Sequence, residues 1–131
     1  MARIDIRLLP DTDSTAFLKE VRRLLGAGFD VKVLVTSPPT PPSPAAGRLY
    51  HAMERALKPE GPVVPTFVAG FTDSRFFRER GIPAYGLSPF LLGPEDTQGI
   101  HGTNERIPLR ELDRGVVRMR QILSFYVSVA Q

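Results

Sequence analysis

The sequence predicts an α/β fold, because segments with strand-like patterns alternate with segments that show helical spacing. In "RIDIRL", residues 3–8, apolar and charged residues alternate strictly, which indicates a half-buried strand. Apolar residues then recur at helical spacing from Phe17 to Leu25, between the capping sequence "DTDS" and the helix-ending "GAG". The segment "FDVKVLVT", residues 29–36, is rich in β-branched residues and predicts a second strand. The first unit is therefore predicted to be strand–helix–strand.

The segment "SPPTPPSP", residues 37–44, carries five prolines in eight positions. Proline is excluded from helix interiors and central strands, and it favours a stiff extended connection. We therefore expect a hinge between two structural units. A ligand for a proline-binding module is the alternative.

Three helices are predicted after the hinge. Apolar spacing marks the first from Leu49 to Leu57, with His51 on its solvated side. The second spans "TDSRFFRERG", residues 72–81, with Thr72 or Asp73 as its cap and a glycine at its end. The third closes the chain, and its long apolar stripe predicts deep packing. The members of that stripe are Leu109, Leu112, Val116, Met119, Ile122, Leu123, Phe125, Tyr126, Val129 and Ala130.

Two short apolar segments between these helices predict strands. They are "GPVVPTFVAG", residues 61–70, and "IPAYGLSPF", residues 82–90. The second part of the chain is therefore predicted to run helix–strand–helix–strand–helix. A loop without periodicity, which holds His101, precedes the closing helix.

Composition excludes several classes of protein. The 131 residues include no cysteine, which rules out disulfides, thiol catalysis and thiolate metal sites. No apolar run approaches the ~20 residues of a membrane helix, and the first residues do not form a signal peptide. The net charge of +3 suits small anionic substrates, while the arginines lack the interleaved aromatic residues of a nucleic-acid-binding module. We expect neither a nucleic-acid nor a membrane partner. The compartment is undetermined, with the cytoplasm as the working expectation.

His101 stands between glycines in "GIHG", at a predicted sharp turn. A neutral imidazole is a competent zinc ligand, and neighbouring glycines permit a close approach. A loop histidine bonded to backbone is the alternative. Catalytic zinc takes three protein ligands, and no convincing set is present, so most of such a site would lie elsewhere. Glu105 could contribute only if the loop curled.

A second candidate site lies at the start of the helix at 72–81. Free backbone N–H groups at a helix N-terminus suit carboxylates or phosphates. Thr72 adds a hydroxyl donor, and Arg75 adds a guanidinium that can bind a carboxylate with two hydrogen bonds. The alternative makes Thr72 a cap and Arg75 a solvated side chain.

The segments "DIRLLPDTDSTAFLKEVRRLL", "GFTDSRFFRERGIPAYGLSPF" and "IHGTNERIPLRELDRGV" resemble the zinc metallopeptidases of the aminoacylase, succinyl-diaminopimelate desuccinylase and glutamate carboxypeptidase family. The order and spacing of these segments resemble those of the corresponding segments in the C-terminal part of that family's members. The resemblance implies that residues 1–36 are the second half of a ferredoxin-like lid or dimerisation domain. Residues 37–44 would be the hinge, and residues 45–131 the last segment of an α/β catalytic domain.

The same resemblance implies a site with two zinc ions and a glutamate as general base. His101 matches the last metal ligand, and Glu105 an acidic position beside it. Arg7 and Arg75 match arginines that bind the substrate carboxylate. Thr72 and Asp73 match the loop that supports that end of the substrate. Phe71 stands where the family usually has glycine, which suggests a different pocket.

The resemblance leaves the family's other ligands and its base outside this sequence. We therefore expect a fragment of an amide-cleaving hydrolase that is inactive by itself and acts, within its parent, on N-acyl amino acids or small peptides with a free carboxylate. Exposed strand edges predict a homo-oligomer. The alternatives are a non-catalytic interaction module and a basic nucleic-acid-binding domain.

Overall fold

The computed structural model describes residues 1–68 and 70–128, which divide into two compact units. The first unit comprises Met1–Ser43 and Val68–Tyr85, and the second comprises Pro44–Phe67 and Gly86–Gln131. The chain first passes from one to the other at the end of the proline-rich segment. The assignment of residues 1–36, 37–44 and 45–131 to a lid, a hinge and a catalytic segment stays a prediction.

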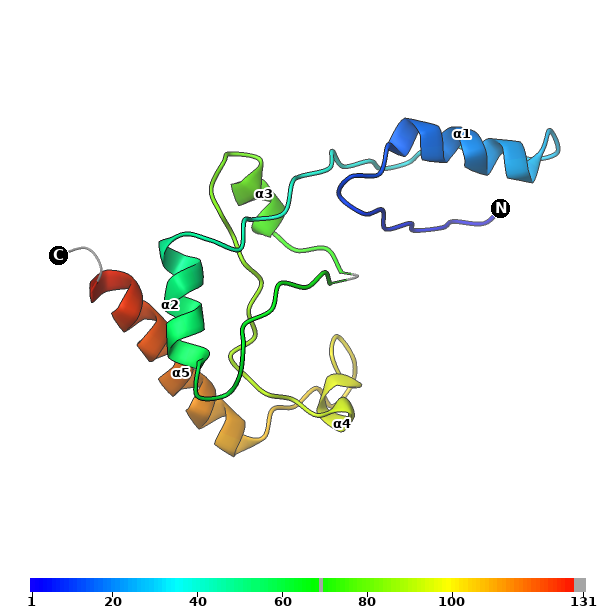
Figure 1. The fold of residues 1–131 in the computed structure, drawn as a ribbon. Coiled ribbons are helices and arrows are strands. Elements are labelled where there is room, and N and C mark those ends of the chain that lie inside the picture. Colours follow the sequence, from blue (N-terminus) through cyan, green and yellow to red (C-terminus); the bar gives the residue numbers. More distant parts are fainter. Residues whose placement is uncertain (69, 129–131) are drawn as a thin grey trace. The chain divides into compact units, whose positions relative to one another are not determined.

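The first unit contains helices α1, Ser14–Leu25, and α3, Ser74–Arg78 (Figure 1). The carboxylate of Asp13 caps α1 by accepting hydrogen bonds from the N–H groups of Thr15 and Ala16, at 2.8 and 3.1 Å. Gly26, with a φ of 71°, ends α1. Both ends of this helix therefore lie where the sequence predicts them.

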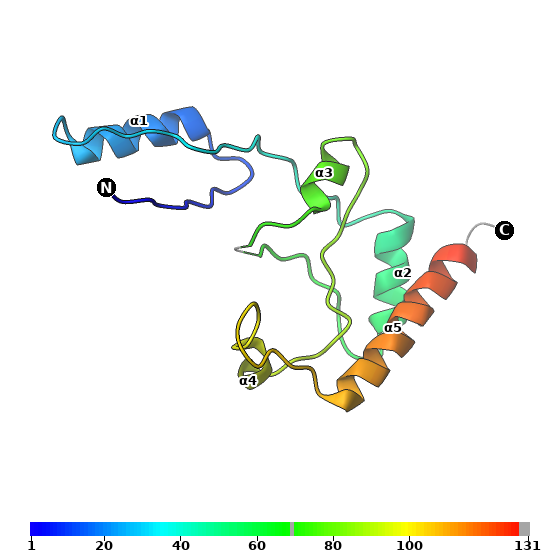
Figure 2. The ribbon, with the colours of Figure 1, turned by 180° about the vertical axis from the view of Figure 1, so that it is seen from behind.

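The second unit contains α2, Arg48–Leu57, the short α4, Pro94–Thr97, and α5, Leu109–Ser128. Helices α2 and α5 lie side by side in both views (Figures 1 and 2). The predicted positions Val129 and Ala130 lie outside the described residues. His51 is exposed as expected, and its Nδ1 lies 2.8 Å from a carboxylate oxygen of Glu54.

The apolar core of the second unit lies between α2 and α5. Its buried side chains are Tyr50, Ala52, Met53, Ala56 and Ile122. The hydroxyl of Tyr50 also donates to the carbonyl of Val63, at 3.1 Å, which attaches the chain after α2 to this core. Within the described residues, no helix is both long enough and apolar enough to cross a membrane.

The strands predicted at 3–8, 29–36, 61–70 and 82–90 do not form among the described residues. The described parts of these segments are not helical, and those on either side of α1 run as extended chain (Figure 1). A strand needs backbone hydrogen bonds to a neighbouring strand. Periodicity in the sequence indicates which face of a segment is apolar, but it does not indicate whether a neighbouring strand is present. The helices of the α/β prediction are thus present, whereas the described residues do not confirm its strands.

The predicted burial of the α5 stripe is also wrong for most of its members. Leu112, Val116 and Leu123 are 43%, 53% and 55% exposed. The buried residues of α5 are instead Glu111, Gly115, Arg118 and Ile122. This face meets the short α2 and the chain at 89–91, whereas the broad apolar stripe would need a larger apolar partner than the described residues provide.

A buried ionic network holds α5 to the rest of the second unit. The guanidinium of Arg118 donates to the carboxylates of Glu60 and Glu111, at 2.6 and 3.1 Å, and to the carbonyl of Pro89, at 2.7 Å. Glu111 in turn accepts from the N–H of Leu91, at 3.2 Å. The side chains of Arg118 and Glu111 are each 6% exposed. Two residues of α5, two turns apart, therefore hold the chain at 89–91 against the helix.

Gly115, which lies between these two residues on α5, allows that close approach. A Cβ atom at this position would collide with the ring of Phe90. The absence of a side chain lets the segment that precedes α4 lie directly on α5.

Replacement of Arg118 by methionine is expected to lower the free energy of unfolding by about 3 kcal/mol, because it removes the buried cation of Glu111 and leaves that carboxylate only its pairing with the exposed Arg114. Arg120→Met is the matched control, since Arg120 lies on α5 and is exposed. Urea unfolding followed by helical circular dichroism measures both. Equal losses in the two variants would contradict a stabilising role of the network.

Stability is also expected to fall in acid because of Glu111. Its hydrogen bond from Arg118, helped by those from Leu91 and Arg114, holds the pKa of Glu111 below its ordinary value of 4.5. Between the lowered and the ordinary pKa of Glu111, the unfolded chain binds more protons than the folded chain. The contribution of ionised Glu111 to the free energy of unfolding is therefore complete above the ordinary pKa. It is lost as the pH falls through the lowered pKa. The urea midpoint should therefore decline less steeply in acid for Glu111→Gln than for the parent chain. Parallel profiles would contradict the assignment.

Candidate functional site

The segment that carries His101 is a tight turn after α4. The N–H of Ile100 donates to the carbonyl of Thr97, at 3.2 Å, and the N–H of Gly102 donates to the carbonyl of Gly99, at 2.9 Å. His101 itself has a φ of 62°, in the left-handed region that non-glycine residues seldom adopt. The sharp turn expected at this histidine is therefore present, and the His101 side chain is exposed.

The loop curls back on itself between Gly99 and Glu105. A Cβ atom on Gly99 would lie 3.2 Å from the Cα atom of Glu105, so the two backbones touch. Arg106 also lies 3.6 Å from the carboxylate of Asp96 on α4, which closes the loop on that helix. The curled loop brings the Glu105 backbone to the start of the His101 turn, and the Glu105 side chain is exposed.

Within residues 1–68 and 70–128, no three histidine or acidic side chains lie close enough together to hold a metal ion. The exposed imidazole of His101 fits the chemistry of a single zinc ligand. This part of the chain could therefore supply one ligand, with others provided from elsewhere.

The residues Thr72, Asp73 and Arg75 belong to the first unit, at the start of α3. Asp73 occupies the N-cap position, but no side chain caps this helix with a hydrogen bond. The prediction that the side chain of Thr72 or Asp73 caps it is therefore wrong. Asp73 has helical backbone angles, φ −65° and ψ −11°, whereas a capping side chain ordinarily needs an extended backbone at that position. Both side chains are exposed.

Arg75 is held by two aromatic rings. Its Cζ atom lies 4.4 Å from the centre of the Phe71 ring and 4.3 Å from that of Phe76. The Nε atom is buried and has no hydrogen-bond partner among the described residues. Arg75 is half-buried, so it is not the freely solvated side chain of the alternative interpretation.

Arg7 approaches the same aromatic ring. Its Cζ atom lies 5.6 Å from the centre of the Phe71 ring, and its Nη2 donates to the carboxylate of Asp5, at 3.0 Å. The structure thus gathers Arg7 and Arg75 around Phe71, within one unit. His101 and Glu105 belong to the second unit.

The aromatic contacts of Arg75 were not predicted from the sequence. Phe71 and Arg75 are four residues apart, a spacing that brings side chains together on a helix, but Phe71 precedes α3. Phe76 follows Arg75 directly, and adjacent residues do not face each other on a regular helix. The contact depends on the irregular start of this five-residue helix.

The chain around α3 is attached to the proline-rich segment. The hydroxyl of Ser43 bonds both the N–H and the carbonyl of Ala84, each at 2.9 Å. Arg78 donates to the hydroxyl of Thr40, at 3.4 Å. These bonds fix the segment after α3 within the first unit.

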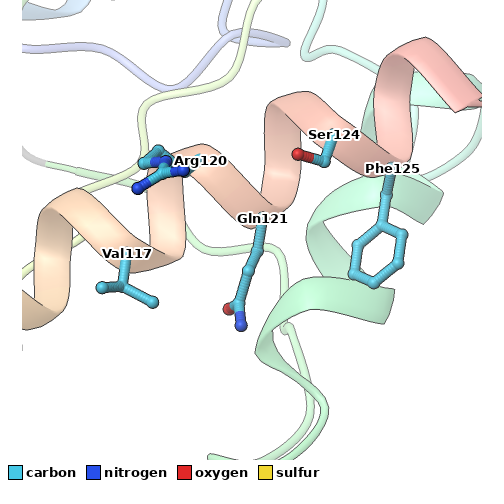
Figure 3. A pocket seen from close by; sticks show the side chains of 5 residues that line it. All are labelled: Val117, Arg120, Gln121, Ser124 and Phe125. Carbon is cyan, nitrogen blue, oxygen red and sulfur yellow. The ribbon is translucent and has the colours of Figure 1, made fainter.

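A shallow hollow on α5 carries no comparable chemistry (Figure 3). It is lined by Val117, Arg120, Gln121, Ser124 and Phe125, all from that one helix. The Cζ atom of Arg55 from α2 lies 4.2 Å from the centre of the Phe125 ring. With side chains from a single helix, the hollow offers no converging polar groups for a ligand.

Comparison with known proteins gives a consistent result. The sequence profile described as Peptidase family M20/M25/M40 matches residues 10–124. Aminoacylase-1 of Mus musculus is 32% identical over 98% of this chain and 32% of its own length. The N-fatty-acyl-amino acid synthase/hydrolase PM20D1 of Xenopus tropicalis is 33% identical over 99% of this chain and 25% of its own. The probable carboxypeptidase S-like 2 of Dictyostelium discoideum is 23% identical over 95% of this chain and 24% of its own length. No solved structure gives a significant match.

The turn that follows α3 should be sensitive to substitution at Gly81, which lies three residues after the end of the helix and has a φ of 73°. The N–H groups of Gly81 and Ile82 donate to the carbonyls of Arg78 and Phe77, at 2.9 and 3.0 Å. A Cβ atom on Gly81 would meet nothing within 4 Å, so Gly81→Ala should cost about 1 kcal/mol through backbone strain alone. Urea unfolding and amide hydrogen exchange at Ile82 measure the loss.

Gly86→Ala is the matched control for Gly81→Ala. Gly86 has no positive φ, and a Cβ atom there would also meet nothing within 4 Å. Its replacement should leave stability unchanged or slightly raised. Equal effects at the two glycines would show that the left-handed backbone of Gly81 is not the cause.

Proposed function

Because this chain belongs to Peptidase family M20/M25/M40, we propose that it supplies the C-terminal portion of a zinc-dependent hydrolase that cleaves amide bonds of N-acyl amino acids or small peptides. The family match over residues 10–124 is the observation that carries the proposal, since it includes both "TDSRF" and "IHGTNERI". The chain spans about a third of the length of the mouse relative and a quarter of that of the frog relative. The whole protein's activity is therefore part of the proposal.

The substrate class is proposed from the relatives and from the arginines. Two of the relatives carry names that refer to N-acyl amino acids or to an aminoacylase. The products of that chemistry and its substrates carry a free carboxylate, which a guanidinium binds with two parallel hydrogen bonds. Arg75 and Arg7, gathered at Phe71, would bind this carboxylate, with Thr72 and Asp73 beside them.

His101 is proposed as a zinc ligand. Its turn presents the imidazole to solvent, where it can meet ligands from other parts of the protein. Zinc at such a site supplies Lewis-acid polarisation of the scissile carbonyl and a bound water of lowered pKa. Glu105, whose backbone touches that of Gly99, would support the loop and the orientation of the imidazole.

A second candidate function is a non-catalytic interaction module. Several apolar side chains on α5 are exposed, including Leu112, Val116 and Leu123, and such a stripe favours association. This alternative predicts a defined homo-oligomer without zinc affinity. Zinc titration of the chain joined to the remaining two-thirds of an aminoacylase relative distinguishes it from the hydrolase, because only the hydrolase proposal predicts zinc binding there that His101→Ala weakens, and light scattering measures the oligomer.

The hydrolase proposal is tested by complementation. The chain, joined to the remaining two-thirds of an aminoacylase relative, should hydrolyse an N-acetyl amino acid in a zinc-dependent reaction. His101→Ala should lower kcat by more than about 100-fold, because even the loss of a residue that only supports a metal ligand costs 10- to 100-fold. His51→Ala is the control, since His51 is exposed on α2 and paired with Glu54. Equal activity of the two variants would reject His101 as a ligand.

A further inference from the structure

The ring of Phe71 lies against the guanidinium of Arg75, with the Arg75 Cζ atom 4.4 Å from the ring centre. We propose that Phe71 is a positioning residue, whose ring fixes the Arg75 guanidinium so that its N–H edge receives the substrate carboxylate. This inference rests on the proposed function and deepens it, because it assigns the recognition of a free carboxylate to the aromatic–arginine cluster of Phe71, Arg75 and Phe76.

Two aromatic rings lie close to the Arg75 guanidinium. The Cζ atom of Arg75 lies within 4.4 Å of the centres of both the Phe71 and the Phe76 rings. An aromatic face attracts a cation through its negative quadrupole, and a guanidinium stacks on it with its plane. Stacking occupies the faces of the guanidinium and leaves its in-plane N–H donors for another partner.

Arg75 also carries a hydrogen-bond donor that no described residue uses. The Nε atom of Arg75 is buried and has no hydrogen-bond partner within residues 1–68 and 70–128. A buried donor without a partner is rare and costs free energy, because it has lost its water. A carboxylate that bonds the guanidinium edge through Nε and a neighbouring Nη would satisfy this donor with a charge-assisted bond.

The cluster carries a net positive charge. Arg7 and Arg75 lie near the same ring, at 5.6 and 4.4 Å from its centre. The carboxylate of Asp5, 3.0 Å from the exposed Arg7, offsets one of these two charges, whereas no ion pair of Arg75 occurs among the described residues. The cluster therefore keeps one positive charge available for an anion. A neutral amide at the same place would not meet this charge.

The side chain of Phe71 is the element that distinguishes this cluster. The resemblance described above places glycine at this position, which would remove one ring from Arg75 and the shared ring from Arg7. Phe71 is 51% exposed, so its replacement removes an aromatic contact without opening a core. Its substitution consequently isolates the effect on the guanidinium.

The test uses the side-chain Nε–Hε signals of arginine in the ¹⁵N-labelled 131-residue chain, with the Arg75 signal assigned through Arg75→Lys. N-acetyl-L-leucine should shift the Arg75 signal saturably, and N-acetyl-L-leucinamide should not. Phe71→Leu, which keeps an apolar side chain but removes the ring, should weaken binding of the acid about 2- to 5-fold, the usual worth of one cation–π contact. Phe71→Tyr keeps the ring and should bind as the parent chain does.

Phe77→Leu is the matched control, because Phe77 lies on the same helix, is 52% exposed and makes no cation–π contact among the described residues. Equal binding of the acid by the Phe71→Leu and Phe77→Leu chains overturns the proposal. So does an equal response of the Arg75 signal to the acid and the amide, or the absence of a saturable response in the parent chain.

The outcome is separable from that of the proposed function. Carboxylate binding that depends on the Phe71 ring, with no hydrolysis in the complementation assay, rejects the hydrolase and keeps the positioning role. Hydrolysis that depends on His101, with the same KM for Phe71→Leu and Phe77→Leu, rejects the positioning role and keeps the hydrolase.

Discussion

The second unit depends on the buried guanidinium of Arg118. Its three bonds, to Glu60, Glu111 and the carbonyl of Pro89, connect α5 with the chain after α2 and with the chain before α4. A buried charge is stable only when its donors are satisfied, so these segments have to be present together. The apolar core between α2 and α5 is small, and it does not by itself fix the segment at 89–91. The ionic network fixes that segment, and with it the approach of the chain to the His101 loop.

This arrangement explains why the apolar stripe of α5 is exposed. The face that carries Glu111, Gly115 and Arg118 is narrow, polar and suited to one short helix and one extended segment. The stripe of Leu112, Val116 and Leu123 lies outside that contact. The extended segments on either side of α1 also lack a partner for their apolar side chains, because a segment with a strand pattern forms no ladder of backbone hydrogen bonds without a neighbouring strand. The apolar stripe of α5 and the extended segments beside α1 both have the apolar composition of surfaces that ordinarily pack against another part of a protein.

The sequence predicts local features of this fold well and its contacts less well. The Asp13 cap, the end of α1 at Gly26 and the turn at His101 follow from single residues and their neighbours, so they can be inferred without the fold. The burial of Arg118 could not, because it depends on Glu60, which lies far away in the chain. The prediction of the buried face of α5 is wrong for the same reason. Hydropathy identifies the most apolar face of a helix, but it does not indicate which segments of the chain pack against that helix. At the candidate site, the resemblance identified Arg7, Arg75 and His101 as candidates, while the rings around Arg75 depend on the irregular start of α3.

His101 and Arg75 are both positioned by local backbone structure. His101 is itself a left-handed residue in a tight turn, and Arg75 is carried by a short helix that the left-handed Gly81 follows three residues after its end. Neither device requires a large core, because backbone hydrogen bonds within a few residues define each of them. The backbone that carries each side chain can therefore keep its local conformation although little apolar surface is buried around it. A metal ligand and a carboxylate receptor need such fixed directions more than they need burial, because metal coordination and bidentate hydrogen bonding both depend on angles. Local backbone geometry and aromatic stacking thus preserve the chemistry of these residues where the packing of the chain is sparse.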